Sequence, residues 1–394
     1  MHEVVVVGMA RTPAGRFNGG FASLTAMQLG GHAIAGALAR GGIDAEAVDG
    51  VVMGHVLQAG QGQITARQAA VAGGLGLGVP AETINKVCLS GMTAISRARD
   101  LIRVGDAEVV VAGGMESMTS APYVLDKARF GYRMGDGTLT DVMMHDGLVC
   151  AFDHCAMGLA TETFQRDKGL EITREQQDAW SARSHARAVA AWDAGRFADE
   201  VVPVEVPQRR GDPVTIARDE GIRADTTTES LAKLRPAFDR EGTITAGNAS
   251  QISDGAAALV LTSREVAERR GLEVLATLTA WGTVAGPDTS LHLQPAAAIE
   301  VAAGRAGVDP AGFDLYEINE AFASVAIAST RALGVDEERV NVHGGGVALG
   351  HPIGCSGARI VVSLISALQQ RGGGSGAAAL CGGGGQGDAL TLEV

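Results

Sequence analysis

Short runs of apolar residues alternate along most of the chain with segments in which apolar positions recur every three or four residues. The short runs are rich in β-branched or small side chains, which is typical of strands buried between two layers of helices. They lie at residues 4–7, 51–53, 83–87, 109–112, 256–261, 275–280, 315–318, 377–380 and 389–392. The pattern therefore predicts an α/β fold with helices on both faces of its strands.

Helix ends are marked by glycine in the first part of the chain. One apolar helix face covers residues 24–38 and ends before Gly41-Gly42, and a second covers residues 92–102 and stops at Gly105. Glycine is favoured just past a helix because it adopts the left-handed backbone conformation without a steric penalty. These segments and their strands predict an N-terminal α/β unit.

The composition changes between about Ser120 and Asn248, where charged residues, aromatic residues and prolines are more frequent. Within this stretch Thr173 and Gln176 form a capping box that opens a long helix ending at Gly195. We therefore predict three parts: an N-terminal α/β half at 1–118 that is continued by 249–270, an inserted domain at 119–248, and a C-terminal α/β half at 271–394.

The two α/β parts resemble each other. Ser90-Gly91 opens a helix and the next strand ends in Gly113-Gly114, whereas Ser356-Gly357 opens a helix and the next strand ends in Gly382-Gly383. The glycine spacings are 22 and 25 residues, which favours a duplicated strand-turn-helix-strand unit. Chance similarity between glycine-rich turns is the alternative. Two such halves, stacked face to face, would bring their strand ends together at one site.

Charge and cysteine content exclude several classes of protein. The 394 residues carry a formal charge of -13, which argues against a general nucleic-acid surface. No apolar stretch is long enough to span a membrane, and the run at 4–7 is too short for a signal peptide. Five scattered cysteines fit reduced thiols better than a disulfide framework. We expect a cytoplasmic protein without nucleic-acid or membrane partners.

Cys88 lies where a β-branched run gives way to a helical pattern. A thiol at a helix N-terminus meets the positive end of the helix dipole and unpaired backbone N–H groups, and both favour the thiolate. A buried structural cysteine is the alternative interpretation.

Three further clusters follow strands of the second half. Asn319 follows the run at 315–318, where it either caps a helix or orients a substrate. His351 is fixed by Pro352 in a glycine-rich loop, and Cys381 ends a strand and precedes four glycines. Together with Cys88 they supply a nucleophile, an orienting amide, a base and a second proton carrier.

Here the sequence resembles the thiolase family. Four motifs carry the resemblance, in order: Asn-Lys-x-Cys-x-Ser-Gly at 85–91, Asn-Glu-Ala-Phe-Ala at 319–323, Gly-His-Pro-x-Gly-x-Ser-Gly at 350–357 and Cys-x-Gly-Gly-Gly at 381–385. The resemblance implies a duplicated five-layer α/β/α/β/α core, an inserted loop domain that covers the CoA site, and ping-pong transfer of acyl groups between thiols.

The resemblance also implies residue roles. Cys88 would carry the acyl group after His351 removes its proton, and Cys381 would take a proton from the methyl group of acetyl-CoA. One oxyanion hole would use His351 and a water held by Asn319, and the other would use the backbone N–H groups of Cys88 and Gly383. The positions implied to contact CoA or substrate are Leu148, Met157, Arg223, Phe238, Ala246, Gly247, Ser250, Leu291, Ala321 and Phe322.

We expect a short-chain thiolase that interconverts acetoacetyl-CoA plus CoA and two acetyl-CoA. CoA thioesters would be its substrates, with no metal, no permanently bound cofactor, and a dimer or dimer of dimers as the assembly. The chain departs from the family pattern at Ala156, at His343 and at 291–295, so the acyl chain length stays open. A longer-chain 3-ketoacyl-CoA thiolase is therefore one alternative.

Two other classes are less consistent with the residues. A decarboxylating ketoacyl synthase would use a cysteine with two histidines, or with histidine and asparagine, and would lack Cys381 as a proton carrier. A non-catalytic acyl-CoA or lipid carrier would not need the paired thiols Cys88 and Cys381.

Overall fold

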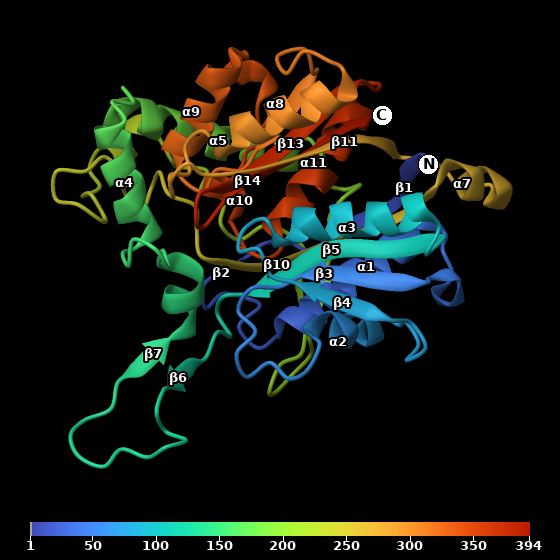
Figure 1. The fold of residues 1–394 in the computed structure, drawn as a ribbon, viewed down its shortest axis with the longest axis horizontal. Helices are drawn as coiled ribbons and strands as arrows, with labels where there is room; N and C mark the ends of the chain where they lie inside the picture. The colour runs from blue at the N-terminus through green and yellow to red at the C-terminus, as the bar shows by residue number, and fades with distance from the viewer. Residues whose placement is uncertain (1) are drawn as a thin grey trace.

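One mixed sheet forms the centre of the molecule in the computed structural model, which describes residues 2–394 (Figure 1). Its strand order is β12-β13-β14-β11-β1-β10-β5-β3-β4, with β2 beside β10. These strands are β1 (Val4–Arg11), β2 (Gly15–Arg16), β3 (Gly50–Gly54), β4 (Ala81–Ile84), β5 (Val109–Ser117), β10 (Ser253–Ser263), β11 (Ala276–Ala285), β12 (Leu315–Ile318), β13 (Ser375–Gly382) and β14 (Gln386–Glu393). The helices around them are α1 (Ala26–Gly41), η1 (Ala45–Ala47), α2 (Thr65–Ala72), α3 (Ser90–Val104), α7 (Arg264–Arg270), α8 (Gln294–Ala306), α9 (Ala323–Leu333), η3 (Glu337–Arg339), α10 (Gly346–Leu349) and α11 (Ser356–Gln370).

The sheet consists of two halves with the same pattern of strand directions. In the N-terminal half β4, β3 and β5 are parallel, and β10 and β1 follow antiparallel. In the C-terminal half β12 and β13 are parallel, and β14 and β11 follow antiparallel. The halves join along β1 and β11 through Val5 with Thr277 and Val6 with Ala276. The duplication predicted from the glycine spacing is therefore present in the strand order.

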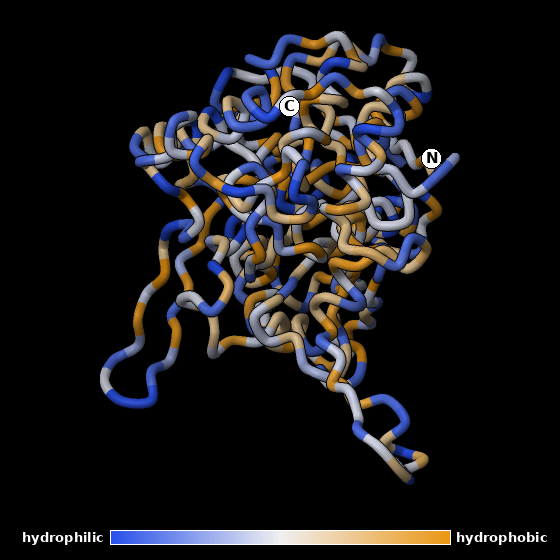
Figure 2. Tube along the Cα trace, turned by 90° about the vertical axis from the view of Figure 1, so that its left-hand side faces the viewer, coloured by the Kyte–Doolittle hydropathy of each residue, from blue (hydrophilic) through white to orange (hydrophobic). Residues whose placement is uncertain are grey.

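Helices fill three layers around these two half-sheets. α1 and α2 cover the outer face of the N-terminal half, α8 and α9 cover the outer face of the C-terminal half, and α3 and α11 lie between the halves. Apolar positions gather in the body of the molecule, where these layers pack (Figure 2). The five-layer α/β/α/β/α architecture is confirmed.

The two central helices touch backbone to backbone at their first turns. A Cβ atom on Gly357 of α11 would lie 2.5 Å from the amide nitrogen of Met92, and one on Gly91 of α3 would lie 2.9 Å from that of Ala358. Contacts this short exclude any side chain larger than hydrogen. The glycines thus bring together the two helix starts, and with them the loops that precede each helix.

An inserted segment separates β5 from β10, whereas only residues 383–385 join the equivalent strands β13 and β14. The hairpin of its first two strands projects from the body at the lower left of Figure 1. The elements of this segment are β6 (Tyr123–Leu125), β7 (Leu139–Asp141), η2 (Met143–Leu148), α4 (Met157–Asp167), α5 (Arg174–Asp193), β8 (Val204–Val206), β9 (Val214–Ile216) and α6 (Thr228–Leu231).

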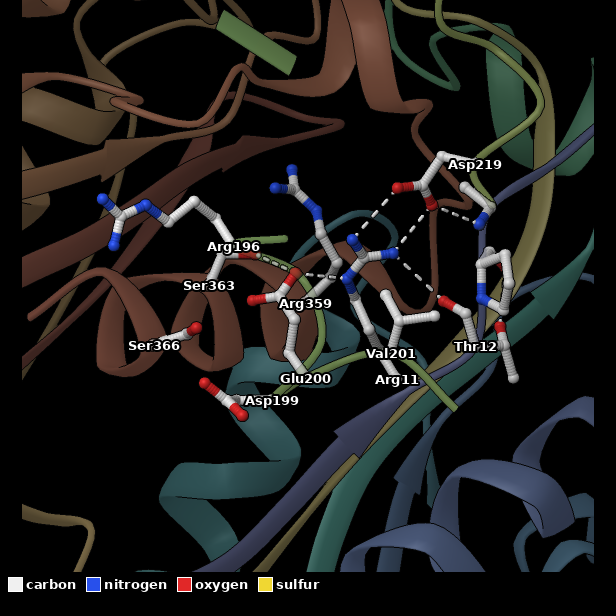
Figure 3. Close-up of polar contacts among 12 residues, drawn as sticks. Arg11, Thr12, Arg196, Asp199, Glu200, Val201, Asp219, Arg359, Ser363 and Ser366 are labelled. Atoms are coloured by element: carbon white, nitrogen blue, oxygen red, sulfur yellow. Dashed lines mark hydrogen bonds and ion pairs between the residues drawn. The ribbon is translucent and has the colours of Figure 1, made fainter. Parts of the chain in front are cut away.

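A buried ion cluster fastens the inserted segment to β1 (Figure 3). Arg11 donates from Nε to Glu200 at 2.6 Å and makes a forked contact with Asp219 at 2.7 and 3.0 Å. All three side chains are at most 1% exposed. Arg359 of α11 lies beside Glu200 in the same view. A charge pair this deeply buried is costly to break from one side, because the remaining charge loses its partner.

The predicted strands are present, but several extend further than predicted: β1 ends at Arg11, β5 at Ser117 and β11 at Ala285. The helix α3 ends at Gly105 in the left-handed conformation, and Thr173 with Gln176 caps α5 as predicted. The strand predicted at 83–87 is wrong at its end, because β4 stops at Ile84 and Val87 has a φ of 51°. In residues 2–394 no helix has both the length and the apolar character needed to cross a membrane.

Candidate active site

A small cavity lies where the strand ends of the two halves meet, at the starts of α3 and α11. Its volume is ≈ 60 Å³, which is room for only a few non-hydrogen atoms. Both halves and the inserted segment contribute to its wall. The residues that line it are Val87, Cys88, Gly147, Leu148, Met157, Ser250, Leu291, Ala321, Phe322, His351, Ile353, Cys381, Gly382 and Gly383.

Cys88 is held in a tight turn between β4 and α3. The Oδ1 atom of Asn85 accepts the amide of Val87, and the hydroxyl of Ser90 accepts the amide of Lys86 while donating to the carbonyl of Val87. The positive φ of Val87 is strained for a β-branched residue, and strain of this kind is typical of functional sites. The turn places Cys88 two residues before the first residue of α3.

Burial outweighs the helix end in setting the ionisation of Cys88. Burial raises the pKa of the thiol to about 12, and the amide groups of Cys88 and Gly383 oppose this only partly. The backbone amides at the helix start therefore favour the thiolate as expected, but burial has the larger effect in the free protein. At neutral pH about one thiol in 100,000 is ionised at this pKa, so the nucleophile needs a base.

His351 is the candidate base, because its ring lines the same cavity as Cys88. The Nδ1 atom lies 2.5 Å from the hydroxyl of Ser356, which donates its single proton to the carbonyl of Pro352 at 2.9 Å. Ser356 then accepts from Nδ1–H, which leaves Nε2 as the unprotonated ring nitrogen, facing the amide group of Asn319. Burial, and then the charge of Arg359, lowers the pKa of His351 to about 3. The imidazole is neutral in the resting site.

Asn319 lies beside the His351 ring, with its Nδ2 atom 3.4 Å from Nε2. Its backbone amide donates to Ala379 in the neighbouring strand β13, which fixes its position. The Oδ1 atom is buried and has no hydrogen-bond partner within residues 2–394. An acceptor of this kind is satisfied by a water that donates one proton to it and keeps a second proton for another ligand.

Cys381 lies at the end of β13 and is buried. Burial and then the neighbouring Cys88 raise the pKa of its thiol, so the two thiols lie within electrostatic reach of each other. The turn that follows admits only glycine at Gly385, because a Cβ there would lie 1.9 Å from the carbonyl oxygen of Asp288. This turn directs the amide of Gly383 toward Cys88.

The positions implied to contact CoA divide into three groups. Six line the cavity: Leu148, Met157, Ser250, Leu291, Ala321 and Phe322. Phe238 borders it, because its ring packs edge-on against Phe322 with the ring centres 6.1 Å apart. Three lie outside its wall: Arg223, Ala246 and Gly247. Arg223 is exposed and bonds His185 through its backbone amide.

Two buried glutamates position the site, and sequence reasoning assigned neither of them a role. Glu116 of β5 accepts the amides of Val56, Leu57 and Gly354, so it ties the His351 loop to the N-terminal half. Glu320 accepts from Trp180, Ser184, Asn341 and Val347 and ties helix α5 to the second half. The position of Glu320 directly after Asn319, in a run of buried residues, is the one sequence feature that could have indicated its role in tying helix α5 to the second half.

Of the departures from the family pattern, Ala156 and His343 lie outside the cavity wall, whereas Leu291 forms part of it. Ala156 precedes the first residue of α4, and His343 packs edge-on against Phe197. Within residues 2–394 no group of three or more His, Cys, Asp or Glu side chains is arranged to hold a metal ion.

Comparison with known proteins gives a consistent result. The family descriptions "Thiolase, N-terminal domain" and "Thiolase, C-terminal domain" match residues 4–265 and 272–394. A "Probable acetyl-CoA acetyltransferase" of Mycolicibacterium smegmatis is 54% identical over 98% of this chain and 100% of its own. The "Acetyl-CoA acetyltransferase" of Escherichia coli is 47% identical over 100% and 99%. The crystal structure of the Bacillus anthracis acetyl-CoA acetyltransferase superposes with a TM-score of 0.96 at 42% identity, covering 100% of this chain and 99% of that one.

Proposed function

The chain belongs to the thiolase family and is an acyltransferase, and from this premise we propose that it interconverts acetoacetyl-CoA plus CoA and two molecules of acetyl-CoA. One observation supports this most directly. The half-buried thiol of Cys88, the buried thiol of Cys381 and one neutral imidazole surround a cavity of ≈ 60 Å³, which suits an acetyl or acetoacetyl group better than a long acyl chain.

In the cleavage direction Cys88 attacks the 3-keto carbon of acetoacetyl-CoA while its proton passes to Nε2 of His351. The bond between the second and third carbons breaks, and the carbanion of acetyl-CoA takes a proton from Cys381. Acetyl-CoA leaves, and an acetyl group remains on Cys88. The thiol of CoA then gives its proton to Cys381 and takes the acetyl group, and Cys88 recovers its proton from His351. Condensation is the reverse sequence.

Negative charge develops on two carbonyl oxygens in these steps. The first oxyanion is stabilised by protonated Nε2 of His351 and by the water that Oδ1 of Asn319 holds. The second is stabilised by the amides of Cys88 and Gly383, whose effect on the Cys88 thiol supports this orientation. Losing one such donor typically costs about 2.7–4 kcal/mol of transition-state stabilisation.

The two thiols can be tested separately. Cys88→Ala is expected to abolish both reactions. Cys381→Ala is expected to acquire an acetyl group on Cys88, seen by mass spectrometry, while condensation and thiolysis fall by about 1,000-fold or more. Cys355→Ala is the matched control, because this buried cysteine lies outside the cavity wall. Substantial condensation by Cys381→Ala would overturn the role given to Cys381.

Chain length is tested by thiolysis of 3-ketoacyl-CoAs of increasing length. Activity confined to the four-carbon substrate, or nearly so, is expected from the size of the cavity. Activity that rises with length would favour the longer-chain thiolase instead. Leu291→Ala is then expected to extend the range, because Leu291 is 4% exposed and forms part of the wall.

The remaining assignments complete the proposal. CoA lies along the inserted segment, with Arg223 near its phosphates and Phe238, Ala246 and Gly247 on its path. Residues 119–248 form the loop domain over the site. This domain lies between two halves, one made of residues 1–118 together with 249–270 and the other of residues 271–394. The enzyme uses no permanently bound cofactor, and it acts in the cytoplasm as a dimer or dimer of dimers. Five free thiols support the cytoplasmic location.

A further inference from the structure

A second cavity lies at the far ends of α3 and β13 from the candidate active site. It has a volume of ≈ 780 Å³, and a side recess of ≈ 370 Å³ shares part of its wall. Ser375 at the start of β13 borders this cavity, whereas Cys381 near the end of that strand borders the active site. The length of α3 separates the two sites by about 20 Å. The distal cavity is therefore independent of the proposed chemistry.

Three arginines from two helices converge on the recess. Arg99 and Arg103 lie one turn apart on α3, and Arg305 comes from the last turn of α8. One carboxylate borders the recess, that of Asp100, and it lies 3.7 Å from Arg99. The formal charge of the side chains around the recess is thus +2, from three arginines and one aspartate, in a chain whose formal charge is -13.

The other carboxylates border the wider cavity and not the recess. Glu3 forms an ion pair with Arg264, and Asp309 accepts the amide of Ala311 in its own turn. Glu393, at the end of β14, is the third. Two of these three acidic groups therefore have partners other than the arginines of the recess.

Bringing the guanidinium groups together destabilises the free protein. Like charges four residues apart on a helix repel each other, and the Arg99 side chain is only 11% exposed. Burial and then the charge of Arg103 lower the pKa of Arg99, and Arg305 acts in the same direction. Arg305 is held at the mouth by one donor bond to the carbonyl of Trp281, which leaves its other N–H groups for a ligand.

We propose that this recess is a binding site for an oligophosphate, either inorganic or the phosphate chain of a nucleotide. Guanidinium groups bind phosphate oxygens in a forked geometry, and several of them favour a ligand with several adjacent negative charges. Hydroxyl groups of Ser96 and Thr279 border the same recess. The wider cavity has the volume of a small-molecule site and accommodates a nucleoside attached to those phosphates.

The test is calorimetric titration of the full-length enzyme with inorganic tripolyphosphate and, separately, with ATP, in the absence of CoA, because the diphosphate of CoA would itself compete for the recess. Variants of the recess arginines, which lie far from the active site, distinguish binding in the recess from binding at the active site. One site per chain is expected. Equal affinity for the two ligands identifies the phosphates alone as the recognised group, and at least tenfold tighter binding of ATP shows that the nucleoside is also held.

Arg99→Gln and Arg305→Gln are each expected to weaken this binding at least about tenfold. Arg305 is exposed, so its variant remains informative where a change on α3 affects folding. Arg97→Gln is the matched control on the same helix, because Arg97 pairs with Glu82 and lies outside the recess. The absence of saturable binding, binding that is unchanged in the Arg99 and Arg305 variants, or an equal loss in the Arg97 variant would overturn the proposal.

Discussion

The two halves of the molecule begin their central helices alike but connect the strands that follow differently. Ser90 opens α3 and donates back to the carbonyl of Val87, and Ser356 opens α11 and donates back to the carbonyl of Pro352. The strand after α3 leads into an inserted segment of more than a hundred residues, whereas the strand after α11 turns back within residues 383–385. The N-terminal unit thus carries an inserted segment, and the C-terminal unit carries a tight glycine turn.

This difference shows how the two halves of a duplicated fold contribute different parts of one site. In the function proposed above, the N-terminal half presents the thiol that carries the acyl group, and its insertion encloses that group. The C-terminal half supplies the base, the second thiol and a backbone donor, all within short rigid loops. A long insertion at 383–385 would displace the amide of Gly383, so the inserted segment belongs to the other half.

The largest expected effect tests whether the insertion is an integral part of the N-terminal half. Arg11→Met leaves Glu200 and Asp219 buried without their cation, and we expect it to lower the free energy of unfolding by about 3–5 kcal/mol. Urea denaturation at a fixed protein concentration measures this. Arg97→Met, at an exposed ion pair, is the control and is expected to cost less than about 1 kcal/mol. Similar losses in both variants would contradict the anchoring role.

The next effect concerns stability in acid. It bears on the same comparison because, of the four histidines whose pKa burial lowers to about 4 or below, three lie in the C-terminal half. Burial lowers the pKa of His292 and of His343 to about 4. Below the unfolded value of 6.5 the unfolded chain binds protons that the folded chain does not, so stability falls as the pH drops from about 6.5 toward 4. One such histidine accounts for about 2 kcal/mol at pH 5.

His292→Leu isolates this effect. Both ring nitrogens of His292 are buried without a hydrogen-bond partner among residues 2–394, so the substitution removes the titration without removing a bond. The variant is expected to lose about 2 kcal/mol less than the parent between pH 7 and pH 5, in urea denaturation at equal protein concentration. Equal acid losses in parent and variant would show that His292 does not contribute.

The smallest effect compares the two helix-opening serines. Ser356→Ala removes the acceptor of the His351 Nδ1–H, so both tautomers of the ring become populated, and we expect kcat for thiolysis to fall about tenfold with a changed pH profile. Ser90→Ala is expected to lower activity without changing the pH profile, because Ser90 bonds only backbone groups of the Cys88 turn.

Ser366→Ala, on the same helix α11 and away from the cavity, controls for general disturbance of the helix and is expected to retain activity. An unchanged pH profile in the Ser356 variant would show that the hydroxyl does not select the tautomer.

Patterns within short stretches predicted much of this molecule. Specific side-chain contacts, some within a turn and others between distant stretches, explain the rest. Buried parallel strands and glycine helix ends are local signals, so the elements around Gly105 were predictable. The end of β4 was not, because the left-handed conformation at Val87 is imposed by the side chains of Asn85 and Ser90. Likewise the ionisation of Cys88 follows from burial by the second half, which no local pattern contains.

The support given by Glu116 to the His351 loop joins positions more than two hundred residues apart. Nothing in either stretch predicts that partner. The four motifs contain the candidate catalytic residues, and the fold supplies the hydrogen bonds that define the protonation state of each.

The position of β10 has a consequence for synthesis of the protein. All eleven residues of this strand are buried, and it lies between β1 and β5. Both neighbours leave the ribosome before it, and 135 residues lie between the end of β5 at Ser117 and the start of β10 at Ser253. At about 5–20 residues per second the nascent chain waits roughly 7–27 s with two apolar strand edges unpaired. During that interval a chaperone can bind the growing polypeptide at these unpaired apolar edges.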